Sequence, residues 1–172
     1  MTDYYEAFDI SPVPPPGPDV KPPEIFRGIY GMPMFVTVPT PDLAASVNFW
    51  TRGLGFIDLF TVPGQVTHLR RWAFQDVLLV PTGALPAPST VSIGFSCVLS
   101  QVDEIAQACT ALVPGCTSEP RKTPWNTVEL EVITPENARV IMTAARPFDP
   151  DSAEARHLKE NGYMLPQGGE TA

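Results

Sequence analysis

The sequence predicts an α+β protein built from two copies of one β-α-β-β-β unit. Three observations predict this class. Apolar alternation and helical spacing follow each other in the same order in both halves, an aspartate opens each helix, and a proline-rich joint over residues 82–89 separates the halves. A chain of 172 residues is long enough for two small modules to share one core. We expect four segments, at residues 1–30, 31–82, 83–147 and 148–172.

Residues 1–30 are predicted to form a proline-rich N-terminal arm. Residues 12–23 contain seven prolines, which favour an extended, polyproline-like path. The pattern leaves two interpretations open, a disordered tail and an arm packed on its own chain or on a partner. The apolar residues that would dock such an arm are Tyr4, Tyr5, Phe8, Ile10, Ile25, Phe26, Ile29 and Tyr30.

Residues 31–82 are predicted to form the first unit. A β-branched run over residues 34–38 is a strand, and Asp42 then caps a helix that ends at Gly53 and Gly55. Strands are expected over residues 56–62, 66–74 and 77–81, with turns at 63–64 and 75–76. The apolar residues at helical spacing are Leu43, Val47 and Trp50.

Residues 83–147 repeat this order and 148–172 form a tail. A strand over 90–99 precedes a helix that opens at Val102 and Asp103 and ends at Gly115. Strands are expected over residues 116–122, 127–134 and 138–144. The tail contains one expected helix, over residues 151–160, in which His157 lies among charged neighbours as a solvated residue.

Composition excludes some classes of partner and predicts a cellular compartment. Eleven Lys and Arg against nineteen Asp and Glu give a net charge of −8, which argues against nucleic acid and anionic membranes. Three cysteines cannot all pair within one chain, so they are predicted to be reduced core thiols of a cytoplasmic protein. The first residues lack a basic start and an apolar run, and no stretch approaches the roughly 20 apolar residues that span a bilayer.

The repeat resembles the duplicated unit of a known family. The phrase DLAASVNFW over residues 42–50, followed by GLGF over 53–56 and combined with the duplicated β-α-β-β-β order, resembles the vicinal oxygen chelate superfamily. That superfamily comprises glyoxalases, bleomycin-resistance proteins and extradiol dioxygenases, and the resemblance covers residues 31–147. It implies tandem modules that curl a mixed β-sheet into a cup, the glyoxalase/bleomycin-resistance fold, and it implies a homodimer.

The resemblance also locates the positions at which the family's enzymes bind a divalent metal. Here those positions carry Phe35, Gly94 (or Ser92 after a shift of two residues) and Ile141. None of these side chains suits a divalent cation that needs three or four converging ligands. The chain has two histidines in all, His68 and His157. The sequence therefore predicts no metal and no cofactor.

Period-two alternation separates side chains that face the helices from those that face the cup. The residues predicted to face the helices are Val36, Val38, Ile93, Phe95, Cys97, Val128, Leu130 and Val132. The phase of the strand that carries His68 is left open. Trp72 and Trp125 are either core residues or stacking surfaces, and Glu129 and Glu131 either pair with Arg70 or Arg139 or accept hydrogen bonds from a cationic ligand. The candidate ligand-binding set is Phe35, Thr37, His68, Arg70, Trp72, Ser92, Gly94, Ser96, Trp125, Glu129, Glu131 and Ile141.

The resemblance and the missing metal ligands together predict a metal-independent protein that binds a planar or aromatic small molecule. By analogy with metal-free members of the superfamily, it would sequester an antibiotic and carry no catalytic residue. The alternative is a metal-free isomerase or cyclase in which His68 and Glu131 serve as acid and base. A third class, a structural or regulatory module that lost the site, also fits the fold.

Overall fold

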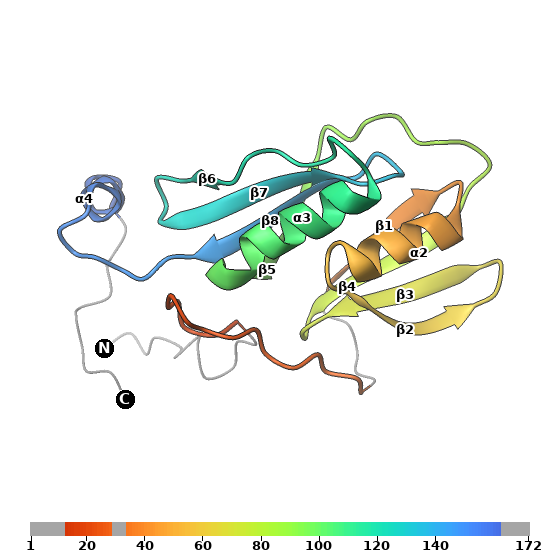
Figure 1. Ribbon diagram of the computed structural model, residues 1–172, viewed down its shortest axis with the longest axis horizontal. Coiled ribbons are helices and arrows are strands. Elements are labelled where there is room, and N and C mark those ends of the chain that lie inside the picture. Colours follow the sequence, from red (N-terminus) through yellow and green to blue (C-terminus); the bar gives the residue numbers. More distant parts are fainter. Residues whose placement is uncertain (1–12, 29–33, 163–172) are drawn as a thin grey trace.

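The structure is a computed structural model that describes residues 13–28 and 34–162 (Figure 1). Two β-α-β-β-β modules follow each other, as predicted. Module 1 contains β1 (Phe35–Thr40), α2 (Leu43–Arg52), β2 (Ile57–Val62), β3 (Val66–Arg71) and β4 (Gln75–Pro81). Module 2 contains β5 (Ser92–Cys97), the 3-10 helix η1 (Leu99–Gln101), α3 (Val102–Leu112), β6 (Arg121–Lys122), β7 (Thr127–Ile133) and β8 (Arg139–Ala145). Helix α4 (Ala153–Glu160) follows.

The strand order is the same in both modules. Sheet 1 runs β1-β4-β3-β2 and sheet 2 runs β5-β8-β7-β6. The pairs β1–β4 and β5–β8 are parallel and the other pairs are antiparallel, so both sheets are mixed. Helices α2 and α3 lie next to each other, each across the sheet of its own module (Figure 1). We call the sheet faces that point away from these helices the outer faces.

Aspartate has a different role in each helix. The Asp42 carboxylate accepts a hydrogen bond from the Ala45 amide at 3.0 Å, which confirms the predicted cap of α2. Helix α3 has no side-chain cap, because η1 leads directly into it. The helix begins at Val102, as predicted, and Asp103 lies within its first turn, where the helix dipole stabilises a negative charge.

Both modules bury side chains in one core. Trp50 and Phe56 of module 1 meet Phe95 of module 2 edge to face, with ring centroids 5.1 to 6.0 Å apart. Trp50 is completely buried, as its helical spacing predicted. The alternation is also confirmed, because the core takes up Val36, Val38, Ile93, Phe95, Cys97, Val128, Leu130 and Val132.

The three cysteines are free and buried, which confirms that they are core thiols. Burial raises the pKa of Cys97 to about 11 and that of Cys109 to about 12. Burial likewise raises the pKa of Cys116. All three thiols are therefore protonated at neutral pH and unreactive in the folded chain.

The hairpin between β3 and β4 begins earlier than predicted. Strand β3 ends at Arg71, residues 72–74 form the turn, and Asp76 lies in β4 instead of in a turn. Trp72 and Phe74 adopt left-handed φ angles of 56° and 62°, which reverse the chain there. Aromatic residues rarely adopt this conformation, so the sequence carries no glycine or asparagine signal for the turn. The strand expected over 116–122 shrinks to β6 with one isolated bridge, Thr117 to Val132.

The described part of the arm packs on its own chain. The Phe26 amide donates to the Trp72 carbonyl at 3.0 Å, and the Ser100 hydroxyl donates to the Val20 carbonyl at 3.4 Å. The arm residues before 13 and over 29–33, including Tyr4, Tyr5, Phe8, Ile10, Ile29 and Tyr30, lie outside the described residues.

Helix α4 starts two residues later than predicted, at a cap made by Ser152. His157 is exposed on it, as expected. Among the described residues no helix has the length and apolar character to span a membrane.

Candidate functional site

The register of sheet 2 gathers the small and polar candidates on one outer face. Directly paired residues point to the same side of a sheet, so each row across β5, β8 and β7 can be read from the pairing. One row contains Ser96, Thr143 and Glu129, and the next contains Gly94, Ile141 and Glu131. Ser92 pairs with Arg139 at the end of β8.

The middle of this face is open. A Cβ atom placed on Gly94 would meet no heavy atom within 4 Å. Ser92 is exposed and Ser96 is half-buried on either side of it. Since these side chains are short, β5 forms a low floor that a flat ligand can approach.

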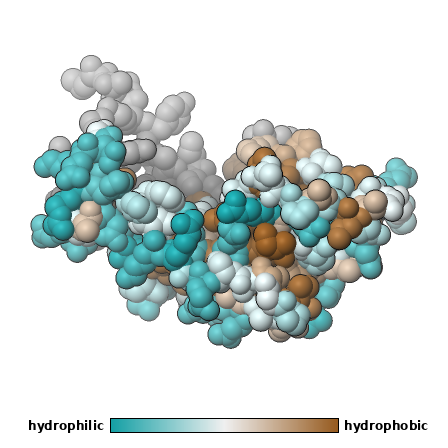
Figure 2. All heavy atoms as spheres, turned by 90° about the horizontal axis from the view of Figure 1, so that it is seen from above, coloured by the Kyte–Doolittle hydropathy of each residue, from teal (hydrophilic) through white to brown (hydrophobic). Residues whose placement is uncertain are grey.

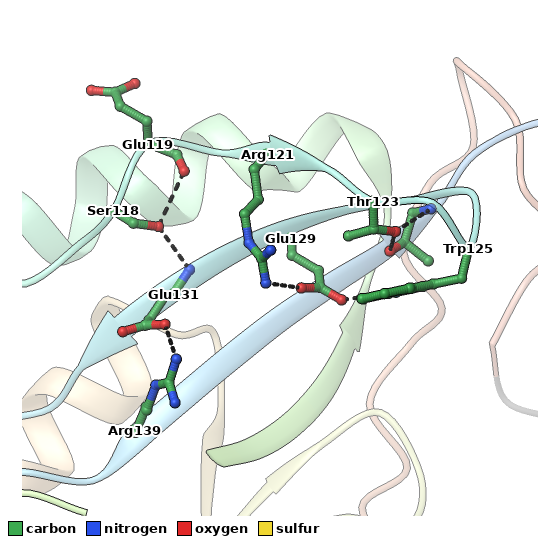
Figure 3. A network of polar contacts seen from close by, with 9 residues as sticks. Ser118, Glu119, Arg121, Thr123, Trp125, Glu129, Glu131 and Arg139 are labelled. Carbon is green, nitrogen blue, oxygen red and sulfur yellow. Dashed lines mark hydrogen bonds and ion pairs between the residues drawn. The ribbon is translucent and has the colours of Figure 1, made fainter. Parts of the chain in front are cut away.

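A half-exposed tryptophan is bound to a carboxylate of this face. Trp125 is 52% exposed, and its indole N–H donates to Glu129 Oε1 at 3.0 Å. Glu129 Oε2 accepts from Arg121 Nη2 at 2.8 Å, so the carboxylate holds both side chains (Figure 3). The indole donor is satisfied by the protein while much of the ring remains in solvent. Trp125 is therefore a held, half-exposed ring and not a core residue.

The second carboxylate of this face forms its own ion pair. Glu131 Oε2 accepts from Arg139 Nη2 at 2.6 Å (Figure 3). The hydrogen bond from Arg139 lowers the pKa of Glu131, and the Glu131 carboxylate in turn raises the pKa of Arg139. The predicted pairing of a glutamate with Arg139 is confirmed. Sequence reasoning missed the pairing of Glu129 with Arg121, because it depends on the short β6 register.

A second polar cluster lies on the outer face of sheet 1. His68 Nε2 lies 2.8 Å and Arg70 Nε 2.7 Å from Asp76 Oδ1. Leu69 between them faces the core, which settles the open strand phase: His68 and Arg70 point outward. Trp72 does not continue this series, because it lies in the turn and is 2% exposed. Phe35 and Thr37 occupy the same face on β1 and are exposed.

The arm covers the sheet 1 cluster. Arg70 is only 1% exposed because its Nη1 donates to the Phe26 carbonyl at 3.2 Å and the Gly28 carbonyl at 2.6 Å. The guanidinium carbon lies 5.9 Å from the centre of the Phe26 ring. We call residues 24–28 the strap. It covers Arg70 on the outer face of sheet 1 but leaves Phe35 and Thr37 of that face exposed, and no such strap covers the floor at Gly94 on sheet 2.

Replacing Phe26 by proline is expected to release the strap, because proline has no amide N–H to donate to the Trp72 carbonyl. Tryptic cleavage after the exposed Arg27 should become several-fold faster, with cleavage after Arg156 as the internal reference. Phe26→Ala keeps the amide and is the matched control, with a smaller expected effect. Equal cleavage rates for the two variants would mean that this hydrogen bond does not hold the strap.

Several solved structures have an architecture similar to that of this chain. No known family profile and no curated protein matches the sequence. The fosfomycin resistance protein FosX from Listeria monocytogenes aligns over 78% of this chain and 99% of its own, with a TM-score of 0.57 and 15% identity. A glyoxalase/bleomycin resistance protein/dioxygenase from Nocardioides aligns over 73% and 89%, with a TM-score of 0.51 and 20% identity. The chain has the α+β fold of these structures, the glyoxalase/bleomycin-resistance fold.

An integron cassette protein from the Halifax Harbour sewage outfall is similar in the same way. It aligns over 67% of this chain and 99% of its own, with a TM-score of 0.54 and 21% identity. Identities this low show only a shared fold. Whether the metal chemistry of vicinal oxygen chelate enzymes is possible here has to be tested on the residues present.

The residues present do not fit the metal of vicinal oxygen chelate enzymes. Gly94 and Ile141 are direct neighbours across β5 and β8, so two aligned positions lie together, but neither side chain has a metal-binding atom. The shifted position, Ser92, pairs with the cationic Arg139. Within residues 13–28 and 34–162, no group of three His, Cys, Asp or Glu could hold a metal ion.

Proposed function

We propose that this protein binds a planar or aromatic small molecule on the outer face of sheet 2 and sequesters it unchanged, without a metal. One observation carries the proposal: Glu129, in the row next to that of Gly94, holds the half-exposed ring of Trp125, and Gly94 leaves the floor of the same face open. Stacking of a ligand ring on an indole contributes about 0.5–1.5 kcal/mol beyond the buried area. The Ser96 and Thr143 hydroxyls of the same face supply hydrogen bonds that fix the orientation of a ligand.

The charges of this face support a binding role. Glu129 and Glu131 are each neutralised by an arginine, so neither carboxylate repels an uncharged aromatic ring. The net charge of −8 favours basic ligands over acidic ones. Two of the similar structures are named as a resistance protein or as a glyoxalase/bleomycin resistance protein/dioxygenase, and antibiotic capture is consistent with both names.

Replacing Gly94 by phenylalanine is expected to weaken ligand binding at least about tenfold, because the new ring fills the floor. The test titrates an anthracycline and a bleomycin-type glycopeptide while following tryptophan emission. Trp50 and Trp72 are buried, so quenching reports Trp125.

Gly83→Phe is the matched control, because a Cβ at that linker position also meets nothing within 4 Å. Trp125→Ala should lose both the affinity and the signal. Native mass spectrometry of the wild type should return the ligand with unchanged mass. Wild-type affinity in Gly94→Phe, or a ligand of altered mass, would contradict the proposal.

A second function, metal-free acid–base catalysis, is favoured by the His68–Asp76 contact. The Asp76 carboxylate orients Nε2 of His68, and Nδ1 has no hydrogen-bond partner in the described part of the chain. A carboxylate that fixes one nitrogen leaves the other to accept a proton. Glu131 is not the partner, because it binds Arg139.

His68→Gln separates the two functions. Stacking on Trp125 involves no group on sheet 1, so sequestration by this variant should keep its wild-type affinity. A general base would instead be lost, and with it any turnover of the ligand. The measurement compares ligand affinity and ligand mass for the wild type and His68→Gln. Loss of a mass change in the variant alone would favour the enzyme.

We also propose that the protein is a homodimer. Phe35 and Phe60 are 48% and 47% exposed, and a partner subunit would cover such side chains. Native mass spectrometry at micromolar protein concentration gives the number of subunits directly. A monomer under these conditions would overturn this part of the proposal.

A further inference from the structure

A cavity lies where the two modules meet, with Thr37 of the sheet 1 outer face in its lining and none of the residues placed above on the outer face of sheet 2. Its volume is about 340 Å³, and it opens between the edge strands β1 and β5 under the linker that joins the modules. Most of the lining is apolar and includes Val36, Val38, Val91 and Ile93. Figure 2 shows that hydrophobic residues gather toward the module 1 half of the side that carries the linker, whereas the α4 end is hydrophilic.

One acidic residue, Glu136 of the turn between β7 and β8, lines the same cavity. It is 2% exposed and reaches across to helix α2 of module 1. The Trp50 indole N–H donates to Oε1 at 2.6 Å, and the Ser46 hydroxyl donates to Oε2 at 2.7 Å. Both donors are neutral, and no Lys, Arg or His of the described residues forms an ion pair with Glu136.

The Glu136 carboxylate can accept further hydrogen bonds. Its two oxygens offer about four acceptor directions, and one neutral donor on each oxygen leaves about half of them free. A buried negative charge without a cation is costly, so a cation brought close to it is stabilised more than it would be in water. The valines and Ile93 around it favour an apolar body attached to that cation.

We propose that the cavity between β1 and β5 is a second ligand site that takes a primary amine carried on a compact apolar body. The ammonium group donates to Glu136, and the apolar part packs against Val36, Val38 and Ile93. A cavity of this size is at the small end of ligand pockets, which fits a single ring with a short aminoalkyl arm. The site is independent of the outer face of sheet 2, so it stands whether or not that face binds an aromatic ligand.

The test uses benzylamine, benzyl alcohol and benzoate, which share one ring and differ in charge. It is run on the full chain with Trp125→Phe in an amine-free buffer, so that emission changes come from buried indoles, with Trp50 hydrogen-bonded to Glu136. Ligand-observed NMR measures affinity independently of fluorescence. Benzylamine should bind at least about tenfold more tightly than benzyl alcohol, and benzoate should not bind.

Two variants make the test specific. Glu136→Gln keeps the shape of the side chain and removes its charge, so benzylamine affinity should fall to that of benzyl alcohol. Glu119→Gln, which removes an exposed carboxylate, is the matched control and should bind benzylamine like the parent. Ala87→Phe fills the cavity from the linker without touching Glu136 and should abolish binding of all three probes.

Equal affinities for benzylamine and benzyl alcohol would overturn the proposal. Unchanged benzylamine binding in Glu136→Gln or in Ala87→Phe would overturn it as well. The sheet 2 tests compare Gly94 and Trp125 variants with the wild type, whereas this test compares Glu136 and Ala87 variants in a constant Trp125→Phe background. Failure of one site is therefore distinguishable from failure of the other.

Discussion

Replacing Arg71 by methionine is expected to lower the free energy of unfolding by about 3 kcal/mol. Arg71 is 1% exposed and belongs to module 1, at the end of β3. Its Nη1 donates to the Leu54 carbonyl at 2.9 Å in the same module. Its Nε donates to the Ser96 carbonyl at 3.1 Å, and its Nη2 to Gln101 Oε1 at 2.8 Å, both in module 2. The side chain therefore joins the modules through two hydrogen bonds and makes a third within module 1.

The size of the effect follows from the groups that would be left behind. Methionine fills similar space but donates nothing, so the carbonyls of Leu54 and Ser96 lose the Arg71 hydrogen bonds while they remain largely enclosed. Each unsatisfied buried polar group costs about 1–3 kcal/mol. The loss is partly offset, because no carboxylate of the described residues pairs with the Arg71 guanidinium and this charge no longer has to be buried. Urea unfolding followed by circular dichroism measures the difference.

The pH dependence of stability tests whether the charge at position 71 is desolvated. Burial lowers the pKa of Arg71 to about 10, so the group stays protonated below that pH and the wild-type difference from Arg71→Met should be constant between pH 5 and 8. In Arg71→Lys the introduced amine is desolvated in the same place, which depresses its folded pKa below the unfolded value of about 10.4. Between its lowered folded pKa and the unfolded value of about 10.4, the folded state binds fewer protons than the unfolded state, so the free energy of unfolding rises with pH over this range.

Constant stability of Arg71→Lys from pH 6 to 10 would show that this site is not desolvated. A loss below about 1 kcal/mol for Arg71→Met would show that water or rearranged donors satisfy the carbonyls of Leu54 and Ser96.

The sequence predicts the fold well because the fold depends on periodic signals. Alternation identified which residues of β1, β5, β7 and β8 face the core, and the Asp42 cap with Gly53 bounded α2. Those signals are local, and each one repeats along its element. The duplicated order then needed no information about long-range contacts.

The site was less predictable because it depends on register and on contacts between distant segments. Asp76 was assigned to a turn, since nothing in the sequence announces that Trp72 and Phe74 adopt positive φ angles. Once that hairpin is placed correctly, the pairing of Arg70 with Asp76 follows directly. The strap is different, because its contact joins Gly28 to Arg70 through a main-chain carbonyl that has no sequence signature.

Replacing Glu136 by leucine is the second large effect and is expected to lower the free energy of unfolding by about 2 kcal/mol. Sequence reasoning also missed this residue. The sequence placed it in an ordinary turn before β8, where glutamate is normally solvated. The structure instead buries it against Trp50 and Ser46, 86 and 90 residues away in the chain. Leucine leaves the Trp50 N–H without an acceptor, whereas the Ser46 hydroxyl can turn to Thr40, whose oxygen lies 2.7 Å away.

Glu136→Gln is the matched control for this prediction. Its amide oxygen can still accept from Trp50, and its amide nitrogen can donate to the Ser46 oxygen once the hydroxyl turns to Thr40, so the loss should stay below about 1 kcal/mol. Urea unfolding measures stability, and the emission wavelength of Trp50 in a Trp125→Phe background reports the lost hydrogen bond. Equal losses for leucine and glutamine would show that charge, and not the number of hydrogen bonds, sets the effect.

The two large effects have one physical origin. Arg71 reaches from module 1 to carbonyl and amide acceptors of module 2, and Glu136 reaches from module 2 to donors of module 1. The guanidinium and the carboxylate have different partners, so each charge is held by neutral hydrogen bonds across the same junction. Because these two networks share no residue, the destabilisation of Arg71→Met and Glu136→Leu should add in the double variant to within about 0.5 kcal/mol. A coupling well above that, measured by urea unfolding of both single variants and the double variant, would mean that the two modules shift as rigid bodies when either network is lost.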